Sequence, residues 1–289
     1  MVAILVYTTV VTAIYLRFGK LPPLSLPAVG LLSVAAIGVA TRSREFVRTS
    51  VLFVTVILTY EALQGLTGAL VSSGSVVSLT GIDRALVGSD FVSDIQIMFY
   101  SPVTTFVSTI FYGLHVFLIV VALGVFWFKD RAVYRGYMYS MVLTSYLALL
   151  TFIVIPTAPP WYVGVAKNLL VTGDKMFPST FQSVQTVLLS GESDIFAAFP
   201  SLHIAYATLF SFYMFKIGRK YGLVSLPIAF GVYFSTVYLG QHYLVDLLGG
   251  IAYAMLSVYV VERLILNHQQ TGFPHWSKGA STSRKVPGV

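Results

Sequence analysis

Apolar stretches of nearly bilayer-crossing length recur along the 289-residue chain, and they restrict its fold more than any other feature. A transmembrane α-helix needs about 20 mostly apolar residues. About eight stretches qualify, at 1–18, 24–41, 51–71, 104–128, 137–156, 202–216, 222–240 and 243–264. The last two are nearly continuous, so we expect a tight helical hairpin there. The sequence thus predicts an all-α, polytopic membrane bundle of about eight transmembrane helices.

Composition also favours a membrane protein over a soluble one. Hydrophobic residues make up 56% of the chain, charged residues 10%, and the mean hydropathy is +0.82, whereas a soluble domain has about 25% charged residues. The net charge of +7 would suggest a nucleic-acid partner for a soluble protein. In a membrane protein, basic cytoplasmic loops explain such a charge, so we expect no nucleic-acid partner. The chain has no cysteine, which excludes disulfides and thiolate metal sites.

The positive charges predict the orientation of the helices. Lys and Arg concentrate in alternate loops and after the last stretch, at 42–48, 129–135, 216–220 and 263–285. The positive-inside rule makes these segments and both termini cytoplasmic. The loops 72–103 and 157–200 then lie on the extracytoplasmic or lumenal face, and the first has the pattern of a short interfacial amphipathic helix. Only the short first loop, with Arg17 and Lys20, runs against this orientation.

Two histidines and a carboxylate are predicted to meet on this outer face. F-P-S-L-H at 199–203 closes the second outer loop, and H-Y-L-V-D at 242–246 follows the seventh apolar stretch. His242 and Asp246 share one helical face, so the carboxylate can fix the imidazole tautomer and leave the other ring nitrogen free. The segment before His203 favours a helix start, which attracts oxyanions such as phosphate. Each histidine alone is also compatible with a structural role, but their convergence favours chemistry.

Taken together, these motifs resemble the second and third signatures of the type-2 phosphatidic acid phosphatase superfamily. P-T-A-P-P-W-Y at 156–162 and the Y-x-x-H from Tyr112 to His115 are similar to its inositol phosphorylceramide synthase-like branch. The resemblance covers about 100–265 and implies a six-helix catalytic membrane core. We therefore divide the chain into two extra N-terminal transmembrane helices, the catalytic core, and a polar cytoplasmic tail that we expect to be disordered, at 1–48, 49–266 and 267–289.

The resemblance implies a role for each of the three central residues. His242 is the expected nucleophile, which attacks phosphorus and forms a phosphohistidine, and Asp246 orients it and stabilises its charge. His203 is the expected acid that protonates the leaving oxygen and then the base that deprotonates the acceptor. This division agrees with the residue types, because a nucleophile needs an orienting group and an imidazole with a pKa of about 6.5 suits acid–base work.

The chain departs from the superfamily pattern where cations are expected. The first signature, a lysine followed by Arg-Pro, is not recognisable, and Ser235-Thr236 stands where the third signature opens with Ser-Arg. A phosphate-binding arginine is therefore missing, although electrostatic stabilisation is usually the largest catalytic contribution. Lys167 and Lys175 are the candidate replacements, and both are equally compatible with solvated loop charges.

Further residues are predicted to bind substrate or phosphate. Ser201, Tyr112 and His115 follow from the motifs. Trp161 and Tyr162 either line a lipid entrance or belong to an interfacial aromatic belt. Glu61 lies near the middle of the third stretch, where we expect a structural pairing inside the bundle.

The leading hypothesis is a lipid phosphotransferase that moves a phosphorylated head group, such as phosphoinositol, between membrane lipids through a phosphohistidine. We expect no metal or other cofactor, because the sequence has no ligand cluster of metal-site type. The first alternative is a lipid phosphate phosphatase acting on phosphatidic acid or isoprenyl phosphates, with water as acceptor. The second is a non-enzymatic transporter, whose ionisable residues should mark a path across the bilayer; here they gather at one face.

Overall fold

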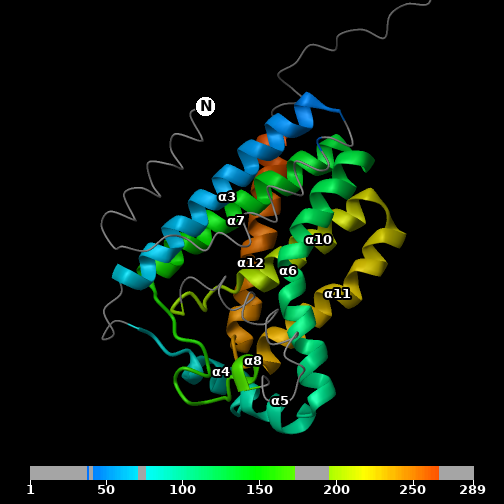
Figure 1. The fold of residues 1–289 in the computed structure, drawn as a ribbon. Helices are drawn as coiled ribbons and strands as arrows, with labels where there is room; N and C mark the ends of the chain where they lie inside the picture. The colour runs from blue at the N-terminus through cyan, green and yellow to red at the C-terminus, as the bar shows by residue number, and fades with distance from the viewer. Residues whose placement is uncertain (1–37, 39–41, 71–75, 173–194, 267–289) are drawn as a thin grey trace, which may run out of the picture.

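The computed structural model describes residue 38 and residues 42–70, 76–172 and 195–266. Helices dominate these parts of the chain (Figure 1). They are α3 (Arg44–Leu70), α4 (Thr80–Val87), α5 (Phe91–Phe99), α6 (Pro102–Lys129), α7 (Arg131–Val154), α8 (Leu169–Thr172), α10 (Leu202–Ile217), α11 (Arg219–Tyr238) and α12 (Leu244–Val260), which a π-helical turn, η3 (Val261–Leu266), continues.

The long helices correspond to the last six predicted stretches, which confirms the all-α membrane fold. Helices α7 and α11 and the segment Leu244–Arg263 are each long and apolar enough to cross a membrane. Helix α6 adds a fourth crossing if its two parts, Pro102–His115 and Phe117–Lys129, form one span bent by 50°. The predicted stretches 1–18 and 24–41 lie almost wholly outside the described residues. The total of eight and the division into three regions therefore remain predictions.

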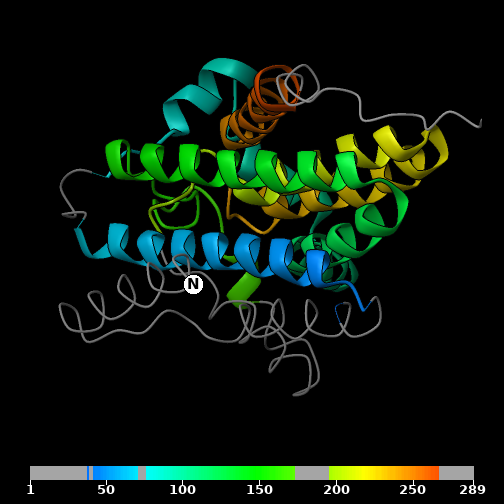
Figure 2. The same ribbon diagram turned by 90° about the horizontal axis from the view of Figure 1, so that it is seen from above.

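Helix α10 lies at the centre of the bundle, where it packs against α6, α7, α11 and α12. A turn at 239–243 joins α11 to α12. The two helices do not form the tight hairpin that the sequence predicted, because each packs against α10 instead of against the other. Helix α3 packs along α7 at the edge of the bundle, as the view from above shows (Figure 2). The first outer loop forms two short helices, α4 and α5, rather than one.

Tyrosine hydroxyls link neighbouring helices through Ser and Thr side chains. Such hydrogen bonds join α7 to α3, α10 and α12, and join α11 to α6 and α10. The pairs are Ser50–Tyr134, Ser140–Tyr213, Ser145–Tyr206, Thr151–Tyr253, Thr105–Tyr238 and Thr208–Tyr233, at 2.6 to 2.8 Å. In lipid, helices gain little from hydrophobic burial against one another, so close packing and polar links of this kind determine how they associate.

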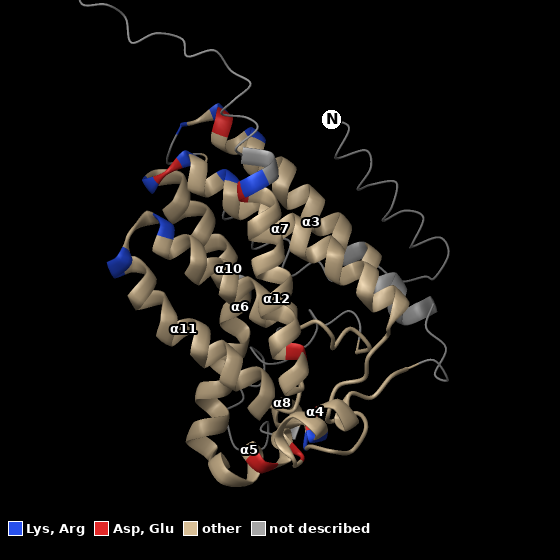
Figure 3. Cartoon of the chain, turned by 180° about the vertical axis from the view of Figure 1, so that it is seen from behind, with Lys and Arg blue, Asp and Glu red and all other residues tan. Residues whose placement is uncertain are grey.

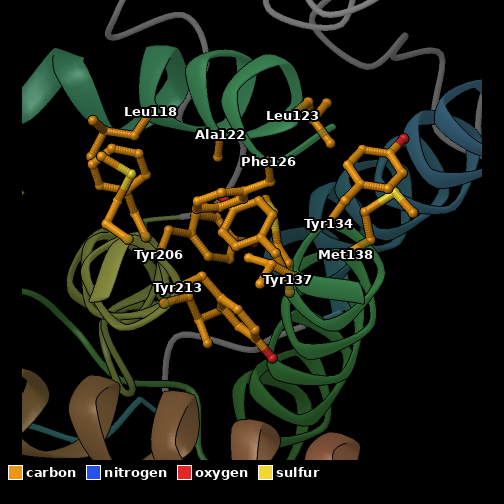
Figure 4. Packing of buried hydrophobic residues seen from close by; sticks show 14 of the residues in the cluster. Leu118, Ala122, Leu123, Phe126, Tyr134, Tyr137, Met138, Tyr206 and Tyr213 are labelled. Carbon is orange, nitrogen blue, oxygen red and sulfur yellow. The ribbon is translucent and has the colours of Figure 1, made fainter. Parts of the chain in front are cut away.

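Aromatic rings fill the space between α6, α7 and α10 (Figure 4). Phe126 of α6 lies with its ring edge-on to Tyr137 of α7, with centroids 5.1 Å apart, and Tyr213 of α10 meets Tyr137 in the same manner at 5.9 Å. All three side chains are buried. This cluster fixes α10 against the two helices that flank it.

The two ends of the bundle differ in their charged residues (Figure 3). Lys and Arg gather where α6 meets α7 and where α10 meets α11, and the short helices α4, α5 and α8 lie at the opposite end. Helix α11 begins at the basic end, so the turn that follows Tyr238 lies at the end that carries α4, α5 and α8. The start of α10 lies there too, because α10 runs antiparallel to α11.

Tyr206→Phe should lower stability, because it removes the hydrogen bond of 2.7 Å between α10 and Ser145 of α7. We expect a loss of about 0.6 kcal/mol, the average for interhelical hydrogen bonds in a membrane protein. The matched control is Tyr137→Phe, because the Tyr137 hydroxyl is buried without a hydrogen-bond partner among the described residues. That variant should be neutral or stabilising. Thermal unfolding in detergent measures both, and equal losses would contradict the role of the pairs.

Candidate active site

His242 lies in the α11–α12 turn with its Nδ1 atom 3.0 Å from the carbonyl oxygen of Ala198 and 3.4 Å from Oδ2 of Asp246. A carbonyl oxygen can only accept, so Nδ1 carries the proton and donates it. In the neutral ring, Nε2 then holds the free lone pair. The sequence predicted the aspartate as the acceptor, but the nearer acceptor is the Ala198 carbonyl. The result is the same: His242 is held in the tautomer that leaves Nε2 nucleophilic.

Asp246 is fully buried and anchors the first turn of α12. Its Oδ2 atom accepts the backbone N–H of Tyr243 at 2.8 Å, and its Oδ1 atom has no hydrogen-bond partner among the described residues. The same carboxylate therefore caps the helix and lies beside the imidazole. The structural and the catalytic interpretation of this pair are compatible with each other.

His203 lies in the first turn of α10 inside a cluster of rings from three parts of the chain. Its ring stacks on Tyr112 of α6 with centroids 4.3 Å apart and an interplanar angle of 27°. The centroid of the His203 ring lies 4.0 Å from that of His115 and 5.6 Å from that of His242. The Nε2 atom of His203 is buried and has no partner among the described residues. His203, His242 and Asp246 thus lie together, as the catalytic hypothesis requires; their roles remain a prediction.

His115 is held by its own helix. Its Nδ1 atom lies 2.7 Å from the carbonyl oxygen of Tyr112, so the same reasoning places a proton on Nδ1 and leaves Nε2 free in the neutral ring. The rings of both predicted residues of the Y-x-x-H motif, Tyr112 and His115, also contact the ring of His203.

The start of α10 lies directly against α12. The N–H of Ser201 donates to the carbonyl oxygen of Asp246 at 3.2 Å. Two glycines permit this approach: a Cβ atom on Gly250 would lie 2.5 Å from the Ser201 carbonyl oxygen, and one on Gly249 would lie 2.5 Å from the ring of Phe199. The Ser201 hydroxyl is buried without a partner in the described part of the chain and does not cap α10. A polar group and the positive end of a helix dipole therefore meet beside His203.

Polar side chains from the segments at this end of the bundle hold the turn that carries His242. The indole N–H of Trp161 donates to Oε1 of Gln241 at 2.9 Å, and the Gln241 amide donates to Oδ1 of Asn168 at 2.9 Å. Gln96 donates to the carbonyl oxygens of Lys167 and Tyr238 at 2.8 and 2.9 Å. Sequence reasoning missed Gln96 and Gln241, for which the only signal was an amide beside apolar residues. The indole N–H of Trp161 thus helps to hold this turn, and its place at a lipid entrance or in an aromatic belt remains a prediction.

The remaining predicted residues lie farther from the chemistry or outside the description. Tyr162 is 47% exposed and packs edge-on against Trp161 and Phe196. Lys167 is exposed, and its backbone N–H donates to Gln96. Lys175 lies outside the described residues, and the side chain of Glu61 is not described either.

Thr236, which stands where the superfamily signature has arginine, is buried. Its carbonyl oxygen accepts the backbone N–H groups of Gln241 and His242, each at 3.1 Å. The residue thus positions the turn through its backbone. Within the described ranges no group of three or more His, Asp and Glu side chains is arranged to hold a metal ion, and metal independence stays a prediction.

Asp83 of α4 binds the first residues of α12. The sequence indicated it only as a charge in a predicted outer loop. Its Oδ2 atom accepts the N–H of Leu244 at 2.9 Å and its Oδ1 atom that of Val245 at 3.0 Å. Burial raises the pKa of the Asp83 carboxyl above its ordinary value, although the two N–H donors oppose this shift. In contrast, the hydrogen bond from exposed Arg84 lowers the pKa of Asp90.

Comparison with known proteins agrees with this arrangement. The model of the PAP2 superfamily matches residues 77–260, which include all of the ring cluster and the α12 turn. The chain belongs to the PAP2 superfamily. Helix α3 lies outside the match, whereas α4 with Asp83 lies inside it.

The curated relatives share one theme in their names. An inositol phosphorylceramide synthase of Candida albicans is 29% identical over 56% of this chain and 36% of its own length. A phosphoinositol dihydroceramide synthase of Bacteroides thetaiotaomicron is 27% identical over 45% of this chain and 46% of its own. The chain thus matches less than half of the length of either relative, and both names agree with the branch that the sequence motifs resemble. No solved structure shows significant similarity to it.

Gly250→Ala should lower activity, because the added Cβ would lie 2.5 Å from the Ser201 carbonyl oxygen and force α12 away from α10. A displacement of about 1 Å in a catalytic group can reduce a rate about 100-fold. Gly81→Ala, where a Cβ meets nothing within 4 Å, is the matched control and should keep full activity. Turnover of a labelled phospholipid by the folded fraction of each variant measures the effect. Equal activities would show that the close approach is unnecessary.

Proposed function

We propose that this integral membrane protein is a lipid phosphotransferase that moves a phosphorylated head group between lipids through a phosphohistidine at His242. The observation that carries the proposal is the Nδ1–H of His242 donated to the Ala198 carbonyl, which leaves Nε2 as the nucleophile beside His203. Family membership and the names of the relatives support the same reaction class.

In the first half-reaction, Nε2 of His242 attacks phosphorus and the bond to the donor lipid's alkoxide oxygen breaks. His203 in its protonated form gives a proton to that oxygen, which leaves as an alcohol. The phosphorylated imidazole gains positive charge as the P–N bond forms. The Asp246 carboxylate, 3.4 Å from Nδ1, and the Ala198 carbonyl at 3.0 Å stabilise that charge.

In the second half-reaction, His203, now neutral, takes the proton of the acceptor hydroxyl. The acceptor oxygen attacks phosphorus, the P–N bond breaks, and Nε2 of His242 recovers its lone pair. The proton that left His203 in the first half-reaction is thereby replaced. Both half-reactions use the same histidine in opposite directions, which agrees with the central place of His203 between Tyr112, His115 and His242.

The phosphoryl oxygens need donors, because Thr236 replaces the expected arginine. We assign this role to the first-turn N–H groups of α10, the Ser201 and Tyr112 hydroxyls, and His115 in its doubly protonated form, because the neutral ring has no proton on Nε2. The unpartnered, buried Ser201 hydroxyl supports the assignment. Lys167 and Lys175 remain candidates for the outer edge of the site.

The donor and acceptor follow from the relatives, whose names mention phosphoinositol, ceramide and dihydroceramide. We propose a phosphoinositol phospholipid as donor and a ceramide-type alcohol as acceptor. The concentration of Lys and Arg at the other end of the bundle supports an extracytoplasmic site with both termini in the cytoplasm.

His242→Ala should abolish both the covalent intermediate and turnover, by more than about 1000-fold, since removal of a nucleophile leaves only residual catalysis. The purified protein is incubated with phosphatidylinositol labelled at phosphorus, with and without ceramide. The wild type should form an acid-labile, base-stable adduct and, with ceramide, labelled inositol phosphorylceramide. The control His268→Ala should behave as wild type. Release of inositol phosphate alone, with ceramide present, would show that water is the acceptor and that the protein hydrolyses the phosphodiester instead of transferring the head group. Unchanged turnover in His242→Ala would exclude His242 as the nucleophile.

The rate should depend on pH as a bell-shaped curve, because His203 must be protonated for the first step and neutral for the second. Activity falls at low pH as the base is lost and at high pH as the acid is lost. The residual activity of His203→Ala should have a pH–rate curve that lacks one of the two limbs. The rings that face His203 are Tyr112, His115 and His242, so His115→Ala serves as the comparison. An unchanged curve in His203→Ala would show that another group carries the proton.

A further inference from the structure

Asp83 makes a contact that the proposed mechanism does not use. It belongs to α4, more than 150 positions before α12 in the sequence, yet its two carboxylate oxygens each accept one of the first N–H groups of α12. The side chain is only 3% exposed. Each carboxylate oxygen of Asp83 accepts from a different N–H group, so the carboxylate fixes both the position and the orientation of the first turn of α12.

The helix start that Asp83 holds carries the nucleophile and its partner. Tyr243 is the N-cap residue, His242 precedes it, and Asp246 lies in the first turn. The Tyr243 hydroxyl lies 3.4 Å from the Ser78 hydroxyl and 3.3 Å from that of Thr80. The segment 78–83 therefore contacts the catalytic turn at two separate places, one through a ring hydroxyl and one through the Asp83 carboxylate.

The same segment is also connected to the acceptor of His242. Val77 donates its N–H to the Pro156 carbonyl and accepts from Ala158, at 2.8 and 3.0 Å. Thr157 in turn accepts the N–H of Ala198 at 3.2 Å. Ala198 is the residue whose carbonyl holds Nδ1 of His242. Residues 77–83 thus support both the backbone that carries the imidazole and the carbonyl that sets its tautomer.

From these contacts we infer that Asp83 is a positioning residue for the nucleophile. It holds the α12 turn so that Nε2 of His242 meets the phosphorus, and it touches neither substrate nor reacting atoms. The inference rests on the proposed phosphotransfer at His242. Removal of groups that orient active-site side chains from behind typically lowers activity 10- to 100-fold in metal sites, and we expect a loss of about that size here.

The test compares Asp83→Ala and Asp83→Asn with Asp94→Ala in the full-length protein. Asp94 is the matched control, because it is an exposed acid on α5 in the same outer loop. For each variant, kcat, KM and the rate of adduct formation from labelled phosphatidylinositol are measured per folded protein. Asp83→Ala should lose about 10- to 100-fold in kcat and in the adduct rate, with KM within about twofold. Asp83→Asn, whose amide oxygen accepts one N–H, should lie between it and wild type.

The outcomes separate this inference from the proposed function. A wild type that forms an adduct, together with an Asp83→Ala variant that keeps the wild-type kcat, overturns the inference alone. A loss that follows only the folded fraction, or only KM, also overturns it, because a merely structural residue behaves in that way. If Asp83→Ala does not fold, wild-type kcat in Asp83→Asn overturns it. A wild type that forms no adduct overturns the proposed function and this inference with it.

Discussion

The close approach of the residues before α10 to the first turns of α12 is the constraint on which the site depends. Gly249 and Gly250 leave room for the ring of Phe199 and the carbonyl of Ser201, and the Ser201 N–H closes the contact by donating to Asp246. Two motifs some forty residues apart are joined by backbone rather than by side chains. His203 of α10 and His242 of the α11–α12 turn are thereby brought close to each other, with ring centroids 5.6 Å apart.

Irregular backbone at this end of a membrane bundle needs internal hydrogen-bond partners, because lipid offers none. Three polar side chains supply them: Asp83 for the N–H groups at the start of α12, Gln96 for the carbonyl oxygens of Lys167 and Tyr238, and Gln241 for the carbonyl oxygen of Leu239. Gln96 and Gln241 both also bind the segment 161–168, through Lys167, Trp161 and Asn168. The site is therefore a junction of loops, and its rigidity derives from the amides and carboxylates that bind those loops together.

The sequence was sufficient to predict the long helices and the meeting of His203, His242 and Asp246, because hydropathy and a four-residue spacing are local properties. It was insufficient for the partners. His242 donates first to the Ala198 carbonyl, and Asp83 binds backbone N–H groups of Leu244 and Val245. No side-chain pattern encodes a contact to backbone, since every residue carries the same groups, and only the folded register decides which one is near. The hydrogen bond from the Trp161 indole to Gln241 could not be predicted for the same reason, because the two residues meet only in the fold.

Two helix termini meet at this site, but they are not electrically equivalent. Asp83 and Asp246 already neutralise the start of α12, whereas the start of α10 has no side-chain cap. A tetrahedral anion would therefore bind nearer to α10, beside Tyr112 and His115. His242 would then attack phosphorus from the side that faces away from these two residues. In an in-line displacement, each lipid alcohol would have to leave or enter on the opposite side, next to α6.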